Sequence, residues 1–194
     1  MDTVTPKNTA PDTSSRARLR RMALVGLMAA LTCILAPMSI PLPFSPVPFS
    51  LTPLVVYFSI YVLGMKQGAF SYLIYLLLGL AGLPVFSGFS GGPGKLLGPT
   101  GGYLIGMLLM AAVCGCFIDR WPSRMLLCFL GMALGTLVNY TFGTVWLAWQ
   151  AGMAFPAALM AGVIPYIPGD LAKMLLVMLL GPQVRNRLKK AALI

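Results

Sequence analysis

The chain has 194 residues, of which 58% are hydrophobic and 9% charged; soluble domains contain only about 45–50% apolar residues, so the composition indicates a membrane protein. Its net charge of +10 comes from short basic clusters between long apolar runs, which fits a membrane surface and argues against nucleic acid. The absence of histidine and the presence of only four acidic residues argue against an enzyme that uses paired carboxylates or histidine.

Residues 1–20 are expected to form a disordered, basic cytoplasmic tail. The first fifteen residues are rich in Thr, Pro, Ser and Asp, have no apolar period, and lead into Arg16, Arg18, Arg20 and Arg21. The run 22–36 could also be the apolar region of a signal peptide. Several comparable runs follow it and no small-x-small cleavage site closes it, so a membrane helix is the preferred interpretation.

Six apolar runs, separated by Gly, Pro or charged residues, predict an all-α membrane protein with a compact bundle of six transmembrane helices. The runs are 22–40, 51–64, 68–83, 101–118, 125–149 and 165–182. Residues 21–184 are therefore expected to be the membrane domain that binds substrate, and 185–194 a basic cytoplasmic tail. The Pro- and Gly-rich stretch 150–167 could be a long outer loop, a re-entrant turn or a short extra helix.

The distribution of charge predicts the orientation. With the N-terminus inside, all basic residues except Lys95 and Lys173 fall in cytoplasmic segments, as the positive-inside rule requires. Both termini are therefore expected in the cytoplasm, and the chain in the plasma membrane as a multi-pass protein. The four cysteines lie in apolar runs without histidine or clustered acids nearby, so we interpret them as small hydrophobic residues and expect neither a metal nor a cofactor.

Asp170 and Lys173 are the charged residues most suggestive of chemistry. Pro168 suits the first turn of a helix, so Asp170 should lie near the start of the last helix, with Lys173 one turn deeper on the same face. Ionised groups at such depth normally face a cavity, a partner or a substrate. One interpretation is an ion pair that locks the bundle; the other is a ligand site, in which Lys173 attracts an anionic group and Asp170 accepts ligand N–H bonds.

Two outer loops and one helix supply further candidates. The glycine-rich stretch 86–103 cannot be a P-loop, because Phe89 and Leu96 replace its required residues; it forms either a tight solvent loop or a loop folded into the mouth of the bundle. The proline-rich segment 37–50 is suited to a lid. A ligand or interhelical packing could engage Asn139 and Tyr140. The candidate binding residues are Asp170, Lys173, Tyr166, Gly169, Ser87, Thr100, Gly101, Tyr103, Asn139 and Tyr140.

Three segments together resemble the BioY family, the biotin-binding S components of energy-coupling factor (ECF) transporters. They are Gly79-Leu80-Ala81-Gly82-Leu83-Pro84-Val85-Phe86, Gly98-Pro99-Thr100-Gly101-Gly102-Tyr103-Leu104 and Ile167-Pro168-Gly169-Asp170-Leu171-Ala172-Lys173. The resemblance, over roughly 20–185, implies a six-helix bundle whose outward pocket is closed by the first and third outer loops. It makes Asp170 and Lys173 the polar anchors for biotin, without saying which end of biotin each one contacts.

The resemblance also implies partners, because an S component works with a transmembrane subunit and two ATPase subunits. In that family small residues four apart on the first helix dock on the transmembrane subunit, and Gly26 and Ala30 have this spacing. Packing within the bundle is the other interpretation of the two residues. An alternative function is a stand-alone secondary carrier that couples uptake of biotin, or of a similar small carboxylate, to protonation of Asp170.

Overall fold

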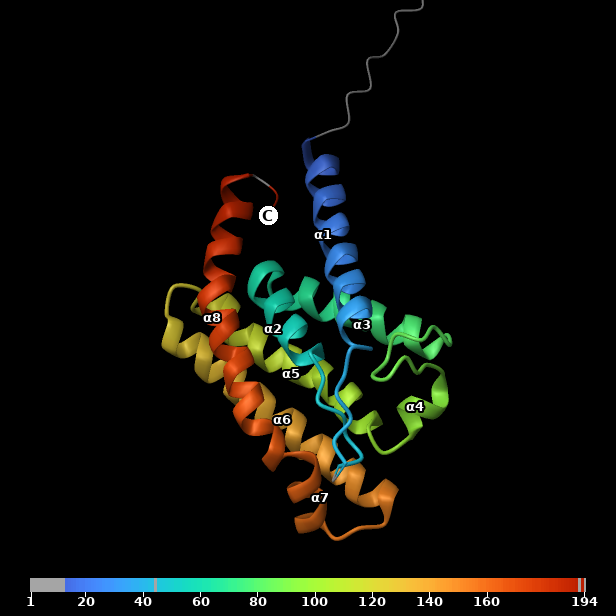
Figure 1. Ribbon diagram of the computed structural model, residues 1–194. Helices are drawn as coiled ribbons and strands as arrows, with labels where there is room; N and C mark the ends of the chain where they lie inside the picture. The colour runs from blue at the N-terminus through green and yellow to red at the C-terminus, as the bar shows by residue number, and fades with distance from the viewer. Residues whose placement is uncertain (1–12, 44, 192, 194) are drawn as a thin grey trace, which may run out of the picture.

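The structure, a computed structural model, describes residues 13–43, 45–191 and 193, and over these residues it is helical without a regular strand. Six long helices form the bundle (Figure 1): α1 Thr13–Leu35, α2 Thr52–Leu63, α3 Met65–Leu80, α5 Gly101–Arg120, α6 Met125–Ala151 and α8 Ile167–Lys190. Three short elements lie between them: α4 Pro93–Leu97, α7 Phe155–Gly162 and the 3₁₀ turn η1 Ile164–Tyr166. The expected all-α bundle of six long helices is confirmed.

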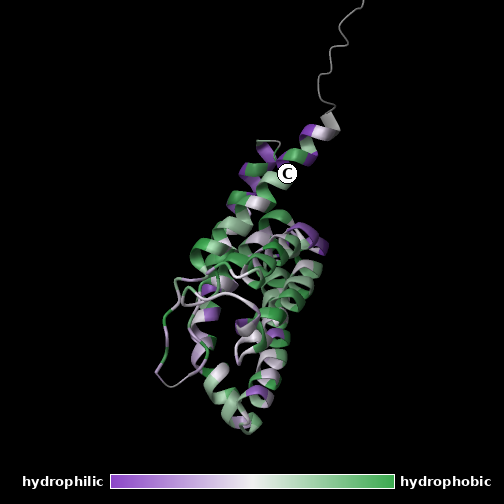
Figure 2. Cartoon of the chain, turned by 90° about the vertical axis from the view of Figure 1, so that its right-hand side faces the viewer, coloured by the Kyte–Doolittle hydropathy of each residue, from purple (hydrophilic) through white to green (hydrophobic). Residues whose placement is uncertain are grey.

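The surface of this bundle is suited to lipid. Three stretches of the described chain are long and apolar enough to cross a membrane, namely Gly101–Arg120, Met125–Ala151 and Phe155–Lys190. Large apolar side chains such as Leu126 and Trp149 are more than 70% exposed, and apolar residues make up much of most helices (Figure 2). Exposure of this kind would be costly in water, so lipid is the solvent of this surface.

The shorter helix α2 is central to the core. It has only 12 residues, but its neighbours α3, α5 and α8 cover most of its surface, so it does not have to match the bilayer thickness by itself. Buried tyrosines on α2 and α3 satisfy their hydroxyls across the bundle: Tyr57 pairs with Thr136 on α6, and Tyr72 donates to the Leu104 carbonyl at 2.9 Å. Such long-range bonds fix how the helices pack.

Close contact between α5 and α6 depends on glycine. An added Cβ on Gly135 would lie 2.9 Å from the Met110 carbonyl oxygen and would also press on Cys114, and one on Gly131 would strike Phe117. The small residues therefore let the two backbones approach each other. Gly131 and Gly135, four residues apart on α6, thus lie at the contact with α5.

Asp119 ties two helix ends together. Its Oδ2 accepts a hydrogen bond of 2.9 Å from the Met65 N–H, which is one of the unpaired donors at the start of α3. Gly64, with φ of 86°, makes the tight turn from α2 into α3. The C-terminal end of α5 is thereby held at the α2–α3 turn.

Some boundaries differ from those expected from the sequence. The first helix begins at Thr13, so residues 13–20, expected to be a disordered tail, are helical; the expectation for residues 1–12 lies outside the described residues. The last helix continues to Lys190 and so includes most of the expected C-terminal tail. In both places basic residues extend an apolar helix beyond the apolar run, because Arg and Lys are good helix formers. The undecided stretch 150–167 contains the short helix α7, the third alternative.

The start of α1 and the end of α8 lie at the same end of the bundle, next to the α2–α3 turn (Figure 1). The N-terminal half of α1 and the C-terminal half of α8 project beyond the other helices, and hydrophilic residues gather on these projecting parts (Figure 2). The opposite end carries the segment 37–50, α4 and α7. An even number of crossings accounts for this arrangement.

Candidate functional site

Asp170 and Lys173 lie together inside the bundle, one turn apart on α8. Their residues are only 6% and 7% exposed, and Lys173 Nζ lies 2.7 Å from Asp170 Oδ1. Pro168 stands in the first turn of α8, where a missing N–H leaves no helical bond unmade. A single buried charge would be strongly unfavourable, so each side chain makes the burial of the other possible.

Further groups from two other parts of the chain complete the surroundings of this pair. The Tyr140 hydroxyl on α6 donates to Asp170 Oδ2 at 2.6 Å. The Lys173 ammonium donates to the Ser50 carbonyl oxygen at 2.7 Å and lies 4.1 Å from the centroid of the Phe49 ring, a cation–π distance. Both carboxylate oxygens and two ammonium hydrogens are therefore engaged, and the pair connects α6, α8 and the segment before α2.

A small cavity of about 60 Å³ lies beside the pair. Its lining comes from α2, α5, α6, α7, η1, α8 and the segment before α2: Val47, Pro48, Ser50, Pro53, Tyr103, Met107, Asn139, Tyr140, Gly162, Tyr166, Asp170 and Lys173. This volume corresponds to about two water molecules in the liquid, whereas pockets for small organic ligands measure roughly 300–1,000 Å³. A ligand of that class can enter only if part of the wall moves.

The part of the wall least tied to the helices is the segment 37–50, which we call the lid. Its backbone pairs with itself between Ile40 and Phe49, through two bonds of 2.8 Å. Tyr166 anchors its tip, because its hydroxyl donates to the Val47 carbonyl and lies 2.9 Å from the Ser45 hydroxyl oxygen. The lid therefore covers the cavity and is fastened by a few side-chain contacts.

Six of the predicted binding residues line the cavity: Asp170, Lys173, Tyr166, Tyr103, Asn139 and Tyr140. Asn139 is 4% exposed, and its Oδ1 has no hydrogen-bond partner within the described residues. An unsatisfied buried acceptor is costly. This oxygen packs against Gly106 on α5, where an added Cβ would lie 2.5 Å from it, so a bound molecule could reach it only if the amide turns towards the cavity.

The other four predicted residues are not part of the lining. Gly169 packs behind it, where an added Cβ would strike the Phe49 ring. Thr100 and Gly101 form the start of α5, and an added Cβ on Gly101 would collide with the Leu96 carbonyl. Ser87 lines a second, outer cavity of about 340 Å³. The binding role of these four residues stays a prediction.

Sequence reasoning did not name six of the lining residues as binding residues. They are Val47, Pro48 and Ser50, which lie in the segment predicted as a lid, and Pro53, Met107 and Gly162. Met107 follows Tyr103 by four positions and so shares its helix face, a signal that was available. Gly162 lies against the Tyr103 hydroxyl and gives no sequence signal beyond small size. Ser50 contributes its backbone carbonyl, which every residue carries, so its side chain could not reveal the contact.

Gly26 and Ala30, the predicted docking residues, are both exposed on α1. No atom lies within 4 Å of a Cβ added to Gly26, so packing inside the bundle does not explain this glycine. Among the described residues no cluster of three or more His, Cys, Asp or Glu side chains could hold a metal ion.

The helical bundle, its apolar surface and the buried charged pair beside a small cavity define an all-helical membrane protein. A family model described as BioY family matches residues 7–190. The chain therefore belongs to the BioY family.

Two relatives and one solved structure agree with this membership. A probable biotin transporter BioY from Pyrococcus horikoshii is 40% identical over 80% of this chain and 90% of its own length. A biotin transporter BioY from Thermotoga maritima is 38% identical over 89% and 97%. The crystal structure of the S component for biotin from an ECF-type ABC transporter superposes with a TM-score of 0.82 at 29% identity, covering 88% and 93% of the two chains. These relatives are transport proteins, which confirms that the chain is not an enzyme.

Proposed function

We propose that this protein binds biotin for uptake, as the S component of an ECF-type transporter in the cell membrane. A transmembrane subunit and two ATPase subunits energise it, Gly26 and Ala30 dock the transmembrane subunit, and both termini lie in the cytoplasm. The observation that carries the proposal is the buried Asp170–Lys173 pair beside a cavity closed by the lid. The family membership and the similarity to biotin transporters support it.

Biotin has the groups that this cavity can satisfy. Its ureido ring carries N–H donors, for which Asp170 and, when its amide turns towards the cavity, the Asn139 Oδ1 are acceptors. Its carboxylate and its ureido carbonyl need a cation or a donor, which Lys173 supplies. Entry of biotin requires the lid to swing away and the lining side chains to separate, because the closed cavity holds only about 60 Å³.

The stand-alone proton-coupled carrier is not favoured. It requires Asp170 to act as a proton carrier, and no observation in the structure indicates that role. The solved structure with the same fold is a component of an ECF-type ABC transporter, which agrees with a chain that relies on separate ATPase subunits.

Equilibrium binding of biotin to the purified full-length protein in detergent tests the proposed site. We expect Lys173→Ala and Asp170→Asn each to weaken binding by about tenfold or more, because each loses a charge-assisted contact of about 1.5–3 kcal/mol. Lys189→Ala, an exposed lysine on the same helix, is the matched control and should bind like the parent. Biotin methyl ester should bind much more weakly than biotin if a cation holds the carboxylate.

A double variant separates a ligand site from an ion pair that only locks the bundle. Each single change leaves a buried charge unpaired, which costs about 3–5 kcal/mol in stability, so weak binding alone could reflect unfolding. Asp170→Asn combined with Lys173→Met removes both charges and should unfold near the parent's temperature while binding biotin poorly. If the double variant is stable and binds biotin like the parent, the proposed site is wrong.

A further inference from the structure

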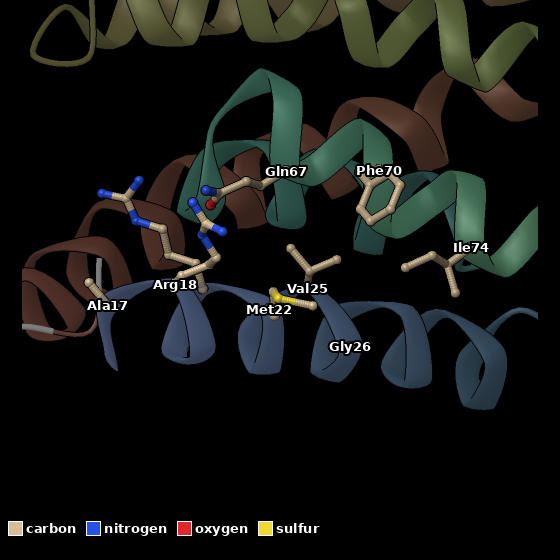
Figure 3. A pocket seen from close by; sticks show the side chains of 9 residues that line it. Ala17, Arg18, Met22, Val25, Gly26, Gln67, Phe70 and Ile74 are labelled. Carbon is tan, nitrogen blue, oxygen red and sulfur yellow. The ribbon is translucent and has the colours of Figure 1, made fainter. Parts of the chain in front are cut away.

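A groove of about 560 Å³ runs between α1 and α3 on the outside of the bundle (Figure 3). Its lining residues are Ala17, Arg18, Arg21, Met22, Val25, Gly26, Gln67, Phe70 and Ile74. None of these residues lines the cavity beside Asp170 and Lys173. The groove is therefore a separate site, and it lies towards the end of the bundle where α1 starts and α8 ends.

The groove is polar at one end and apolar along the rest. Figure 3 shows Arg18 and Gln67 at one end, and Phe70 and then Ile74 further along α3. Arg21 lies one helical turn from Arg18 and so on the same face of α1. Both arginines are exposed, and within the described residues neither forms an ion pair or hydrogen bond.

Gly26 gives the groove its depth. It has no side chain to fill the space beside Val25, and an added Cβ would have no neighbour within 4 Å. Phe70, which lines the facing side on α3, is 56% exposed, so a large apolar surface stands open next to the two guanidinium groups. A molecule that covers the groove needs an anionic head and an apolar chain.

We propose that this groove binds one anionic phospholipid of the leaflet that faces the basic end of the protein. The lipid phosphate pairs with the Arg18 and Arg21 guanidiniums, whose forked donors match phosphate oxygens, and Gln67 donates to the head group. In the protein without its partner subunits, one acyl chain lies along Met22, Val25, Phe70 and Ile74 and over Gly26, which the docked transmembrane subunit would cover instead. Basic pockets between membrane helices on the cytoplasmic side are suited to such head groups, and the bound lipid would fasten the projecting part of α1 at the membrane surface.

Native mass spectrometry of the full-length protein, released from detergent with equimolar dioleoylphosphatidylglycerol and dioleoylphosphatidylcholine, tests this proposal. The parent should retain one molecule of the anionic lipid in preference to the zwitterionic one. Arg18→Gln with Arg21→Gln should reduce that preference roughly thirtyfold, the effect of two interfacial cations, while biotin binding stays as in the parent. Arg187→Gln with Lys189→Gln removes two exposed charges from α8 and should keep the preference.

Gly26→Leu separates a shaped groove from diffuse attraction to a basic surface. It keeps every charge, has space for its side chain, and should reduce retention of the anionic lipid several-fold while circular dichroism shows unchanged helix content. Equal retention of the two lipids by the parent would overturn the proposal. So would full retention by the Arg18 and Arg21 double variant, an equal loss in the Arg187 and Lys189 control, or unchanged retention by Gly26→Leu.

Discussion

Lys173 shows how a membrane bundle can hold an ammonium group away from water. Its charge is balanced by Asp170, and the Ser50 carbonyl accepts a second hydrogen bond from the ammonium group. The ammonium nitrogen also lies over the Phe49 ring. Two of these three partners belong to the lid. The lysine is therefore coupled to lid closure, because opening the lid exchanges a carbonyl and a ring face for water or for a ligand.

Tyr140 on α6 donates a hydrogen bond to Asp170 and so contacts the Asp170–Lys173 pair. Tyr140→Phe removes the 2.6 Å bond to Asp170 and leaves the ring in place. We expect a loss of about 1.5–3 kcal/mol of stability and biotin binding weakened several-fold, measured by thermal unfolding and by titration calorimetry.

Tyr72→Phe is the control for this prediction. It removes another tyrosine hydroxyl bond, to the Leu104 carbonyl, away from the cavity lining. It should lower stability and leave biotin affinity unchanged. Equal losses of affinity in the two variants would show that Tyr140 acts only through general packing.

For individual residues, the sequence predicts the contacts that depend on spacing along the chain. Asp170 and Lys173, three apart at the start of a helix, had to share a face, and their charge made them candidates. The Ser50 carbonyl lies 123 residues away in the chain, and a backbone acceptor has no sequence signature. Ser87 and Thr100 were chosen as polar residues in outer segments, but their distance from the cavity depends on how those segments fold.

Among the elements, the lid controls access to the cavity. Proline stiffens it, the Ile40–Phe49 pair closes it into a hairpin-like arm, and Tyr166 holds its tip. The Tyr166 ring also stacks on Phe49, with centroids 6.4 Å apart. Since the cavity measures only about 60 Å³, against roughly 300–1,000 Å³ for small-ligand pockets, we expect the lid to leave this position when biotin binds and when it is released.

Tyr166→Phe should loosen the lid without removing the stacked ring. We expect both association and dissociation of biotin to become faster, with dissociation changed more, by about fivefold for one hydrogen bond of about 1 kcal/mol. Stopped-flow measurement of the two rates is the test. Ser45→Ala removes only the weaker anchor and should have a smaller effect, and unchanged rates in Tyr166→Phe would mean that the tip contact does not hold the lid.

The six helices were predictable because apolar runs separated by Gly, Pro and charge determine where a chain can cross a bilayer. The ends of these helices were less predictable from the sequence. Asp119 caps α3 from another helix, and the ends of α1 and α8 extend into basic sequence that lacks an apolar period. The stretch before α8 stayed undecided because Pro156 and Pro165 begin short helical elements as readily as they break long ones.

For the whole molecule, the structure has two ends of different character. At one end lie the α2–α3 turn, the basic parts of α1 and α8, and the groove between α1 and α3. At the other lie the lid, α4 and α7, with the cavity beside Asp170 and Lys173 just beneath. The proposed function predicts that the lid end faces the outside, and the positive-inside rule predicts the same orientation from the charge distribution.

Cysteine labelling in intact cells tests this orientation. Gly94→Cys places a thiol on exposed α4 at the lid end, and Asn186→Cys places one on exposed α8 at the basic end. A membrane-impermeant maleimide should label the first variant in intact cells and the second only after permeabilisation, with the parent chain giving the background from its own four cysteines. We expect the basic residues to keep their end inside because moving them across the membrane is unfavourable. The reverse pattern would place the lid in the cytoplasm, where it could not capture biotin from outside.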